Sequence, residues 1–177
     1  MSVYRRFYAH RHPSLITTNV AHRHPLFADR EAAGALVYAL AEAQEELRFH
    51  LHAWVLMPDH LHLVIEVPDG ITSGIVMRFI KARFARRWNH RLRTRGPIWQ
   101  TRFHERVLTS ERALMAAIEY VHANPVAAGL VESAEDYPLS SAKGWDKQSQ
   151  AELLSLVQTS EMLKNLRGPA DARPAPA

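Results

Sequence analysis

The sequence predicts an α+β fold: a ferredoxin-like antiparallel sheet on a split βαβ plan, with helices mainly on one face and one added helix. Short apolar, β-branched runs alternate with longer helical segments in the order strand, helix, strand, strand, helix, strand, helix. Pro58 and Asp59 form a tight turn between the second strand and the third, so these two strands are expected to pair antiparallel. The chain of 177 residues, 47% of them hydrophobic, suits one domain with its own core.

The first half of the chain accounts for three strands and one helix. Residues 15–20 alternate like a strand and are followed by a turn rich in His and Pro. Residues 29–49 are rich in Ala, Leu and Glu, with apolar residues at helical spacing after Asp29, a good N-cap. Residues 51–57 and 61–67 are apolar strands, and the second ends at a Pro-Asp-Gly turn.

The second half supplies the remaining elements. Residues 72–92 form an expected helix that is apolar on one side and basic on the other. Residues 98–109 alternate like a strand, and residues 111–123 form a further helix that is expected to end at Asn124 and Pro125.

We expect the domain to span residues 1–145. Its last part, residues 137–142, reads as coil that packs back on the domain. The rest, residues 146–177, reads as a C-terminal helix at 150–166 and a Pro/Ala-rich tail, in part disordered.

Composition excludes several classes of protein. There is no cysteine, which excludes disulfides and thiolate metal sites. No secretory signal and no apolar run of spanning length is visible, so we expect a cytoplasmic protein without a membrane partner.

Positive charge is concentrated in the middle of the chain. Between Arg78 and Arg106, Glu105 is the only acidic residue. Such a field suits a polyanion such as nucleic acid, although a solvated basic helix face remains an alternative. The basic residues between these two arginines are Lys81, Arg83, Arg86, Arg87, Arg91, Arg93, Arg95 and Arg102.

Two histidines stand one residue apart in the segment MPDHLHLVIEV, residues 57–67. Residues i and i+2 of a strand share a face, so His60 and His62 project side by side and can chelate one divalent cation. Alone, such a pair is more often incidental than a metal site, because the chain has 11 histidines.

A second pair strengthens the metal hypothesis. Tyr120 and Asn124 stand four residues apart on one helical face. Tyrosine offers a nucleophilic hydroxyl and asparagine offers a carbonyl oxygen that can complete a metal's ligand shell. A half-buried core tyrosine and a helix-terminal asparagine are the structural alternatives.

Four motifs together resemble one known family. MPDHLHLVIEV resembles the His-hydrophobic-His motif of single-tyrosine HUH endonucleases, and EYVHANPVAAGLV resembles their tyrosine helix. GPIWQTRF and DYPLSSA resemble two further elements of one branch, the REP-associated tyrosine transposases. The resemblance covers residues 4–142, with the motifs in the expected order.

The resemblance implies a site and a reaction. It implies that Tyr120 is the nucleophile and that His60, His62 and Asn124 hold Mg²⁺ or Mn²⁺. The implied reaction is metal-dependent cleavage of single-stranded DNA by transesterification, through a 5′-phosphotyrosine that permits rejoining during transposition or recombination. No general base is evident; Glu66 shares the strand face of the histidines but also fits a surface carboxylate.

The resemblance further implies that the substrate is single-stranded DNA with a palindromic, REP-type hairpin. Trp99 could stack on an unpaired base, or could anchor the core. Whether the protein acts as a monomer or a homodimer stays open. The candidate phosphate contacts are Arg83, Arg86, Arg87, Arg91 and Arg102.

Two other functions stay open at this point. A non-catalytic, regulatory hairpin-binding protein could keep the same fold, but it would need none of the four site residues. A metal-dependent hydrolase that uses water would leave Tyr120 with a structural role.

Overall fold

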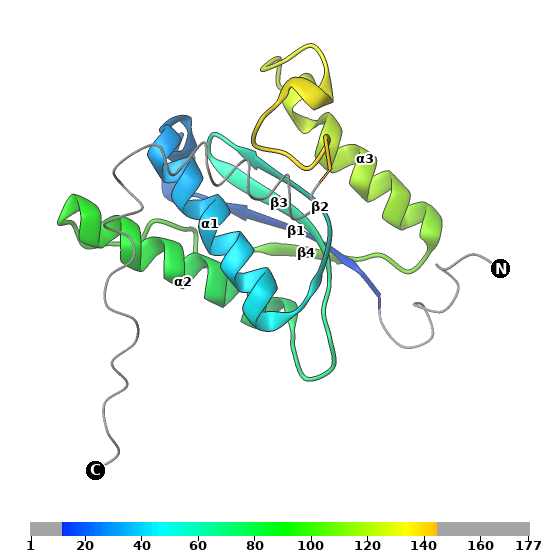
Figure 1. The fold of residues 1–177 in the computed structure, drawn as a ribbon, viewed down its shortest axis with the longest axis horizontal. Helices are drawn as coiled ribbons and strands as arrows, with labels where there is room; N and C mark the ends of the chain where they lie inside the picture. Colours follow the sequence, from blue (N-terminus) through cyan, green and yellow to red (C-terminus); the bar gives the residue numbers. More distant parts are fainter. Residues whose placement is uncertain (1–11, 145–177) are drawn as a thin grey trace.

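The computed structural model describes residues 12–144, and these form a four-stranded antiparallel sheet with three long helices (Figure 1). The strand order is β2-β3-β1-β4, which is the order of a ferredoxin-like split βαβ unit and confirms the predicted fold class. The strands are β1 (Ser14–Asn19), β2 (His50–Met57), β3 (His60–Glu66) and β4 (His104–Val107). The long helices are α1 (Arg30–Leu47), α2 (Ser73–Leu92) and α3 (Glu111–Ala127).

Helices cover both faces of the sheet. On one face α1 and α2 lie side by side (Figure 1), and their apolar sides pack against Ile16, Leu63 and Ile65. On the other face α3 packs on β2 and β3 through Leu114 and Val121. The predicted extra helix therefore sits opposite the other two.

Each long helix begins at a side-chain cap. The Asp29 carboxylate accepts hydrogen bonds from two backbone N–H groups at the start of α1. The hydroxyls of Thr72 and Ser110 do the same for α2 and α3, at one backbone N–H each. Three short 3-10 turns complete the described elements: η2 (Ala21–Arg23), η3 (Leu26–Ala28) and η4 (Ala134–Asp136).

Two element boundaries differ from the sequence prediction. The strand expected at residues 98–109 is limited to His104–Val107, because residues 98–103 leave the sheet and make only an isolated bridge between Trp99 and Val20. Helix α3 continues through Pro125 to Ala127 instead of ending at Asn124. The helix tolerates this proline near its end, where it is buried and Ala128 N still donates to Asn124 O.

The segment after α3 closes one edge of the sheet. The backbone N–H of Leu56 donates to Leu139 O, and Ser141 N donates to Trp54 O. The Tyr137 hydroxyl also donates to Leu56 O at 2.9 Å. The prediction that residues 137–142 pack back on the domain is confirmed.

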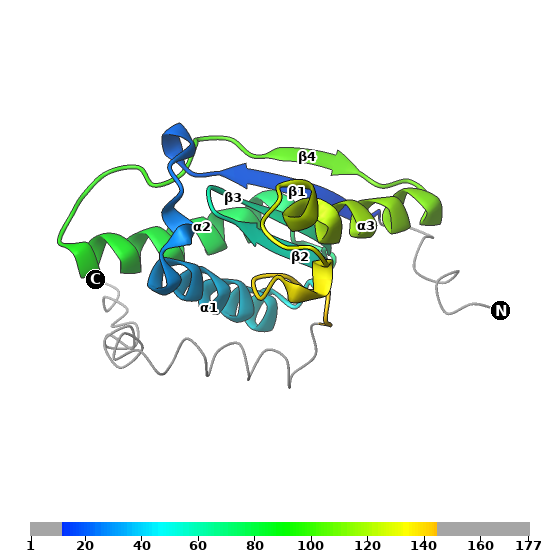
Figure 2. The same cartoon turned by 90° about the horizontal axis from the view of Figure 1, so that it is seen from above.

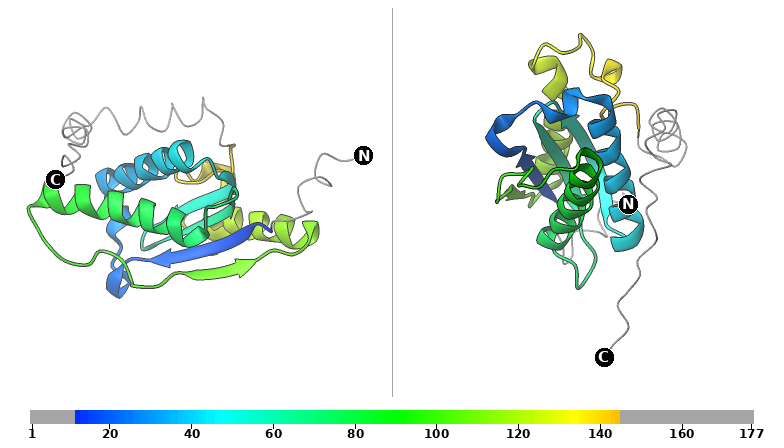
Figure 3. Two further views of the ribbon diagram at one scale, coloured as in Figure 1. Left: turned by 90° about the horizontal axis from the view of Figure 1, so that it is seen from below. Right: turned by 90° about the vertical axis from the view of Figure 1, so that its left-hand side faces the viewer.

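The opposite edge of the sheet is β4, which runs beside β1 (Figures 2 and 3). All four residues of β4 are exposed. Within residues 12–144, no helix is long and apolar enough to cross a membrane. The predicted C-terminal helix and tail lie outside the described residues.

Candidate active site

His60 and His62 lie on one face of β3, as the alternation of the strand predicts, and the structure shows that this face carries α3. In the sheet His60 faces Asn19 and Met57, and His62 faces Thr17 and Val55. Their ring centroids are 4.7 Å apart and the rings meet edge to face. Two imidazoles at this separation can share one metal ion.

A polar neighbour orients each imidazole ring. The Nδ1 atom of His60 lies 2.5 Å from an oxygen of Asp59, and Asp59 also forms an ion pair of 2.7 Å with Arg23. The Nδ1 atom of His62 lies 2.7 Å from the hydroxyl of Thr17. With both Nδ1 atoms engaged, the Nε2 lone pairs are the ones left for a ligand, as in metal-bound histidines.

Helix α3 brings the nucleophile candidate to these rings. Ala117 and Val121 of α3 are buried against the sheet, and Tyr120 lies at the edge of this buried side of the helix, where it is partly exposed to solvent. The ring centroid of Tyr120 lies 5.4 Å from that of His62, while half of the tyrosine stays exposed. This exposure also fits the structural alternative, a half-buried core tyrosine, so the contact with His62 is the observation that favours a nucleophile.

Asn124 completes the group one turn further along α3. Its Nδ2 donates to Tyr120 O at 2.8 Å, so Oδ1 is the amide atom that can face His62 or a metal. The Asn124 side chain lies close enough to His62 to act on the pKa of that imidazole, so it lies beside the metal-facing ring. The structure therefore brings together the four residues that the two sequence motifs contribute.

The environment keeps His62 neutral. Burial, and then the charges of His60 and Arg23, lower the pKa of His62 to about 4, and the hydrogen bond with Asn124 opposes this shift only in part. Neutral imidazole is the form that binds a metal.

The donor set fits an ion such as Mg²⁺ or Mn²⁺ with some of its ligands supplied by the substrate. Within residues 12–144, no three His, Cys, Asp or Glu side chains are arranged to hold a metal. The amide oxygen of Asn124 is the group beside the two rings that could serve as a third protein ligand. Two imidazoles and one carbonyl oxygen leave positions open for phosphate oxygens and water.

Two neighbours considered from the sequence lie elsewhere. Glu66 is six residues along β3 from His60, roughly 20 Å at strand spacing, and it contacts His52 instead. The Nε2 atom of His122 is hydrogen-bonded to the hydroxyl of Ser141 at 2.9 Å. Neither side chain lies beside Tyr120, so the structure supplies no general base from this pair.

Three of the predicted DNA-binding arginines bind glutamates of α1. Arg87 makes two hydrogen bonds to the Glu42 carboxylate, at 2.5 and 2.8 Å. Arg83 pairs with Glu46 at 3.2 Å, and Arg91 pairs with Glu31. These guanidinium groups link α2 to α1, on the sheet face opposite Tyr120.

The other predicted DNA contacts have different environments. Arg86 and Arg102 are exposed. Trp99 is 8% exposed and packs its ring against Phe27 and Phe84, so the core-anchor alternative describes its position.

Sequence reasoning missed the residues that orient the histidines. Thr17 and Arg23 approach the site only through the pairing of β1 with β3 and the turn that follows β1. Asp59 directly precedes His60, and a carboxylate beside a candidate ligand was the one signal that the sequence offered.

Comparison with known proteins points the same way as the geometry. Residues 10–124 match the family model described as IS200-like transposase. A REP-associated tyrosine transposase of Escherichia coli (strain K12) is 28% identical over 142 residues, which cover 80% of this chain and 82% of that protein. The solved structure of a REP-associated tyrosine transposase bound to a REP hairpin superposes with a TM-score of 0.66 at 28% identity, covering 81% of this chain and 84% of that one.

Proposed function

This chain belongs to the family of IS200-like transposases, and on that premise we propose that it cleaves and rejoins single-stranded DNA beside a hairpin through Tyr120. The resemblance to REP-associated tyrosine transposases read from the motifs is confirmed by the match with the E. coli relative. The observation that best supports the proposed chemistry is the contact between the ring of Tyr120 on α3 and the ring of His62 on β3.

Tyr120 would act as the nucleophile of a transesterification. Its Oη attacks the phosphorus of the scissile phosphodiester, and the bond from phosphorus to the 3′ oxygen breaks as the new bond forms. The phenol gives up its proton, and the departing oxygen takes up a proton to become a 3′-hydroxyl. The 5′-phosphotyrosine keeps the phosphodiester energy, so attack by another 3′-hydroxyl rejoins a strand.

His60, His62 and Asn124 would hold the metal ion beside the tyrosine. When bound, Mg²⁺ or Mn²⁺ supplies positive charge that polarises the phosphate and holds it for attack. Asp59 and Thr17 keep the two rings turned with Nε2 toward this position. The exposure of Tyr120 lets a DNA strand reach its hydroxyl.

The substrate class follows from the relatives. A related structure is a complex with a REP hairpin, and we propose that this chain also binds a hairpin of single-stranded DNA. Arg86 and Arg102 are exposed and suited to phosphate contacts, which position DNA without reading its sequence. Arg83, Arg87 and Arg91 could do so only by leaving their glutamates.

A covalent adduct tests the proposed function. The protein is incubated with a labelled single-stranded DNA hairpin and Mn²⁺, then denatured and separated by electrophoresis. We expect a labelled band that survives denaturation in the wild type and is lost in Tyr120→Phe. Tyr38→Phe is the matched control, because this half-buried tyrosine lies on α1, which covers the opposite sheet face.

The same experiment separates the two alternatives. Cleavage without an adduct that persists in Tyr120→Phe identifies a hydrolase that uses water. Hairpin binding without cleavage by the wild type, with Mn²⁺ present, identifies a non-catalytic DNA-binding protein. Either result overturns the proposed function.

A further inference from the structure

The first residue of β4, His104, lies on the same face of the sheet as the candidate active site. His104 pairs with Thr17 of β1, and Thr17 pairs in turn with His62 of β3. Opposite residues of paired antiparallel strands share a face, and Thr17 contacts His62 on the face that carries α3. His104 is therefore level with His62 and two strands away, at roughly 10 Å between the Cα atoms.

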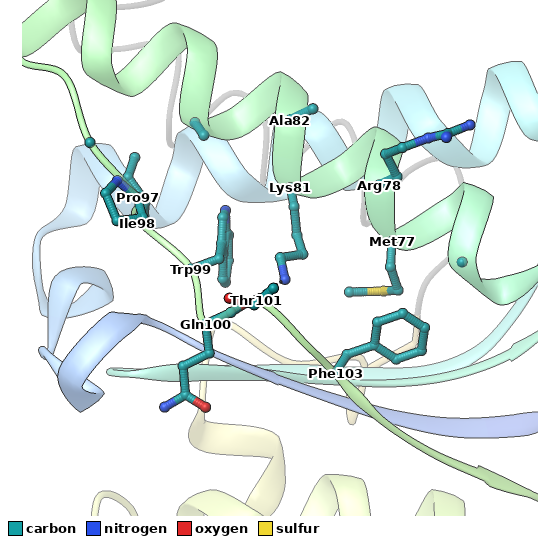
Figure 4. A pocket seen from close by; sticks show the side chains of 13 residues that line it. Met77, Arg78, Lys81, Ala82, Pro97, Ile98, Trp99, Gln100, Thr101 and Phe103 are labelled. Atoms are coloured by element: carbon teal, nitrogen blue, oxygen red, sulfur yellow. Dashed lines mark hydrogen bonds between the residues drawn. The ribbon is translucent and has the colours of Figure 1, made fainter.

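The neighbours of His104 in the chain point to the opposite face. Phe103 packs in the core that α2 covers, and Figure 4 shows its ring close to Met77. The Glu105 carboxylate accepts a hydrogen bond of 2.6 Å from the Ser73 hydroxyl, at the start of α2. Because side chains alternate along a strand, the side chain of His104 points away from α2, toward the side of the active site.

The imidazole of His104 is exposed and not engaged elsewhere. Within residues 12–144, no hydrogen bond or ion pair holds its ring. The charged or titratable groups that share this face are Arg106 on β4, His62 on β3 and Tyr120 on α3, while β1 contributes the neutral Thr17. None of the functions considered above gives His104 a role.

Tyr120 projects from the flank of α3 that faces β1 and β4. His122 lies about 200° around the helix from Tyr120 and is hydrogen-bonded to Ser141, which lies against the outer edge of β2. The other flank, which carries Tyr120, is therefore turned toward β1. All four residues of β4 are exposed, so an open strip of sheet lies between Tyr120 and His104.

We propose that His104 is the general acid of the cleavage step, at the 3′ oxygen that leaves phosphorus. The inference rests on the proposed function and adds a catalytic residue to the same site. In a phosphoryl transfer the attacking and leaving oxygens lie roughly in line, on opposite sides of phosphorus. A phosphate held beside His62 and attacked by Tyr120 from the side of α3 then has its 3′ oxygen on the side of β1 and β4, where His104 stands.

The proton balance of the step is complete. As the bond from phosphorus to the 3′ oxygen breaks, the imidazolium of His104 donates its proton to that oxygen, and the phenol proton of Tyr120 passes to water. In rejoining, the neutral imidazole takes the proton from the attacking 3′-hydroxyl, and the departing phenolate of Tyr120 takes a proton from water. Histidine suits both directions, because it can give and accept a proton near neutral pH.

Two substrates that differ only in the leaving atom test the proposal. One is a synthetic single-stranded DNA hairpin whose scissile bond has been located from the wild-type cleavage product. The other carries sulfur in place of the 3′ oxygen at that bond. A thiolate leaves without a proton, since a thiol is much more acidic than an alcohol, so the sulfur substrate needs no general acid. The rate of adduct formation at Tyr120 with Mn²⁺ is measured for both.

In His104→Gln we expect adduct formation on the oxygen substrate to slow roughly a hundredfold, while the sulfur substrate reacts at the wild-type rate. His90→Gln is the matched control, because this exposed histidine lies on α2, which covers the other face of the sheet, and both rates should stay unchanged. In protein that carries Tyr120→Phe, adding His104→Gln should leave hairpin affinity unchanged, which shows that the variant is folded and binds DNA.

Slowing by the same factor with both substrates, or with neither, overturns the assignment of His104. In either case the wild type still forms the adduct, so the proposed function stands alone. If the wild type forms no adduct with the oxygen substrate or the sulfur substrate, the proposed function fails, and the role of His104 fails with it.

Discussion

The two histidine rings differ in the neighbour that orients each of them. A carboxylate contacts Nδ1 of His60 at 2.5 Å, whereas a hydroxyl contacts Nδ1 of His62 at 2.7 Å. A carboxylate both fixes the tautomer of a metal-bound histidine and increases its basicity. A neutral hydroxyl fixes the ring with less electrostatic effect. The two contacts should therefore differ in their importance for metal affinity.

We expect Asp59→Asn to weaken Mn²⁺ binding by roughly tenfold to a hundredfold, because the Nδ1 proton of His60 loses its carboxylate acceptor. Isothermal titration calorimetry with Mn²⁺ gives the affinity directly. Asp136→Asn is the control, since Asp136 is exposed at η4. An unchanged affinity in Asp59→Asn would show that His60 does not bind the ion through Nε2.

Thr17→Val should have a smaller effect than Asp59→Asn. Valine keeps the shape of threonine but removes the hydroxyl beside Nδ1 of His62. We expect Mn²⁺ affinity to fall severalfold, with the thermal melting temperature of the metal-free protein changed little. A loss as large as that in Asp59→Asn would contradict the distinction between the two contacts.

The site residues could be predicted from the sequence because each pair lies within one element. The strand period places His60 beside His62, and the helix period places Tyr120 above Asn124. That the two pairs meet was implied only by the family resemblance. The approach of Thr17 depends on the register between β1 and β3, which no local pattern specifies.

At the scale of elements, ion pairs join the two helices that cover one face. Arg87 and Glu42 are both largely buried and connect α2 with α1 through two hydrogen bonds. A bidentate pair of this kind is stronger than an exposed ion pair. The basic side of α2 therefore contributes to helix packing, although its sequence alone fits a DNA-binding surface equally well.

We expect Arg87→Met to destabilise the protein by about 1–3 kcal/mol, because Glu42 loses its hydrogen-bond donors. Hairpin affinity should change little, whereas Arg102→Ala should weaken hairpin binding without loss of stability. Urea unfolding gives the free energy of unfolding of each variant, and a binding titration gives the hairpin affinity of each. If Arg87→Met instead weakens binding as much as Arg102→Ala, Arg87 exchanges Glu42 for phosphate in the complex.

Element types were predicted better than element ends. The alternation of residues 98–109 predicted one long strand. In the structure residues 98–103 pack on α2 instead, and only the four residues of β4 join the sheet. Pro125 predicted a helix end, yet tertiary packing buries the proline and the helix continues to Ala127. In both cases contacts with distant residues outweighed the local signal.

At the scale of the whole molecule, the sheet separates two environments. One face carries α1, α2 and their ion pairs, and the other carries α3 with Tyr120 and the candidate metal site. At the end of β3 remote from His60, a second group of titratable side chains lies across β2 and β3. His52 contacts the ring of His50, with centroids 4.3 Å apart, and its Nε2 lies 3.5 Å from a Glu66 oxygen.

This second group should make the stability of the whole domain depend on pH. Burial, and then the charge of His50, lower the pKa of His52 from 6.5 to about 4. The folded protein therefore binds fewer protons than the unfolded chain in this range. The contribution of His52 to stability is fully present above pH 6.5 and is lost as the pH falls through about 4.

His52→Gln removes the titrating group and should flatten this part of the profile. Urea unfolding of the metal-free protein at a series of pH values measures the effect, with His12→Gln, an exposed histidine, as the control. A profile that is as steep in His52→Gln as in the wild type would show that other groups cause the acid sensitivity.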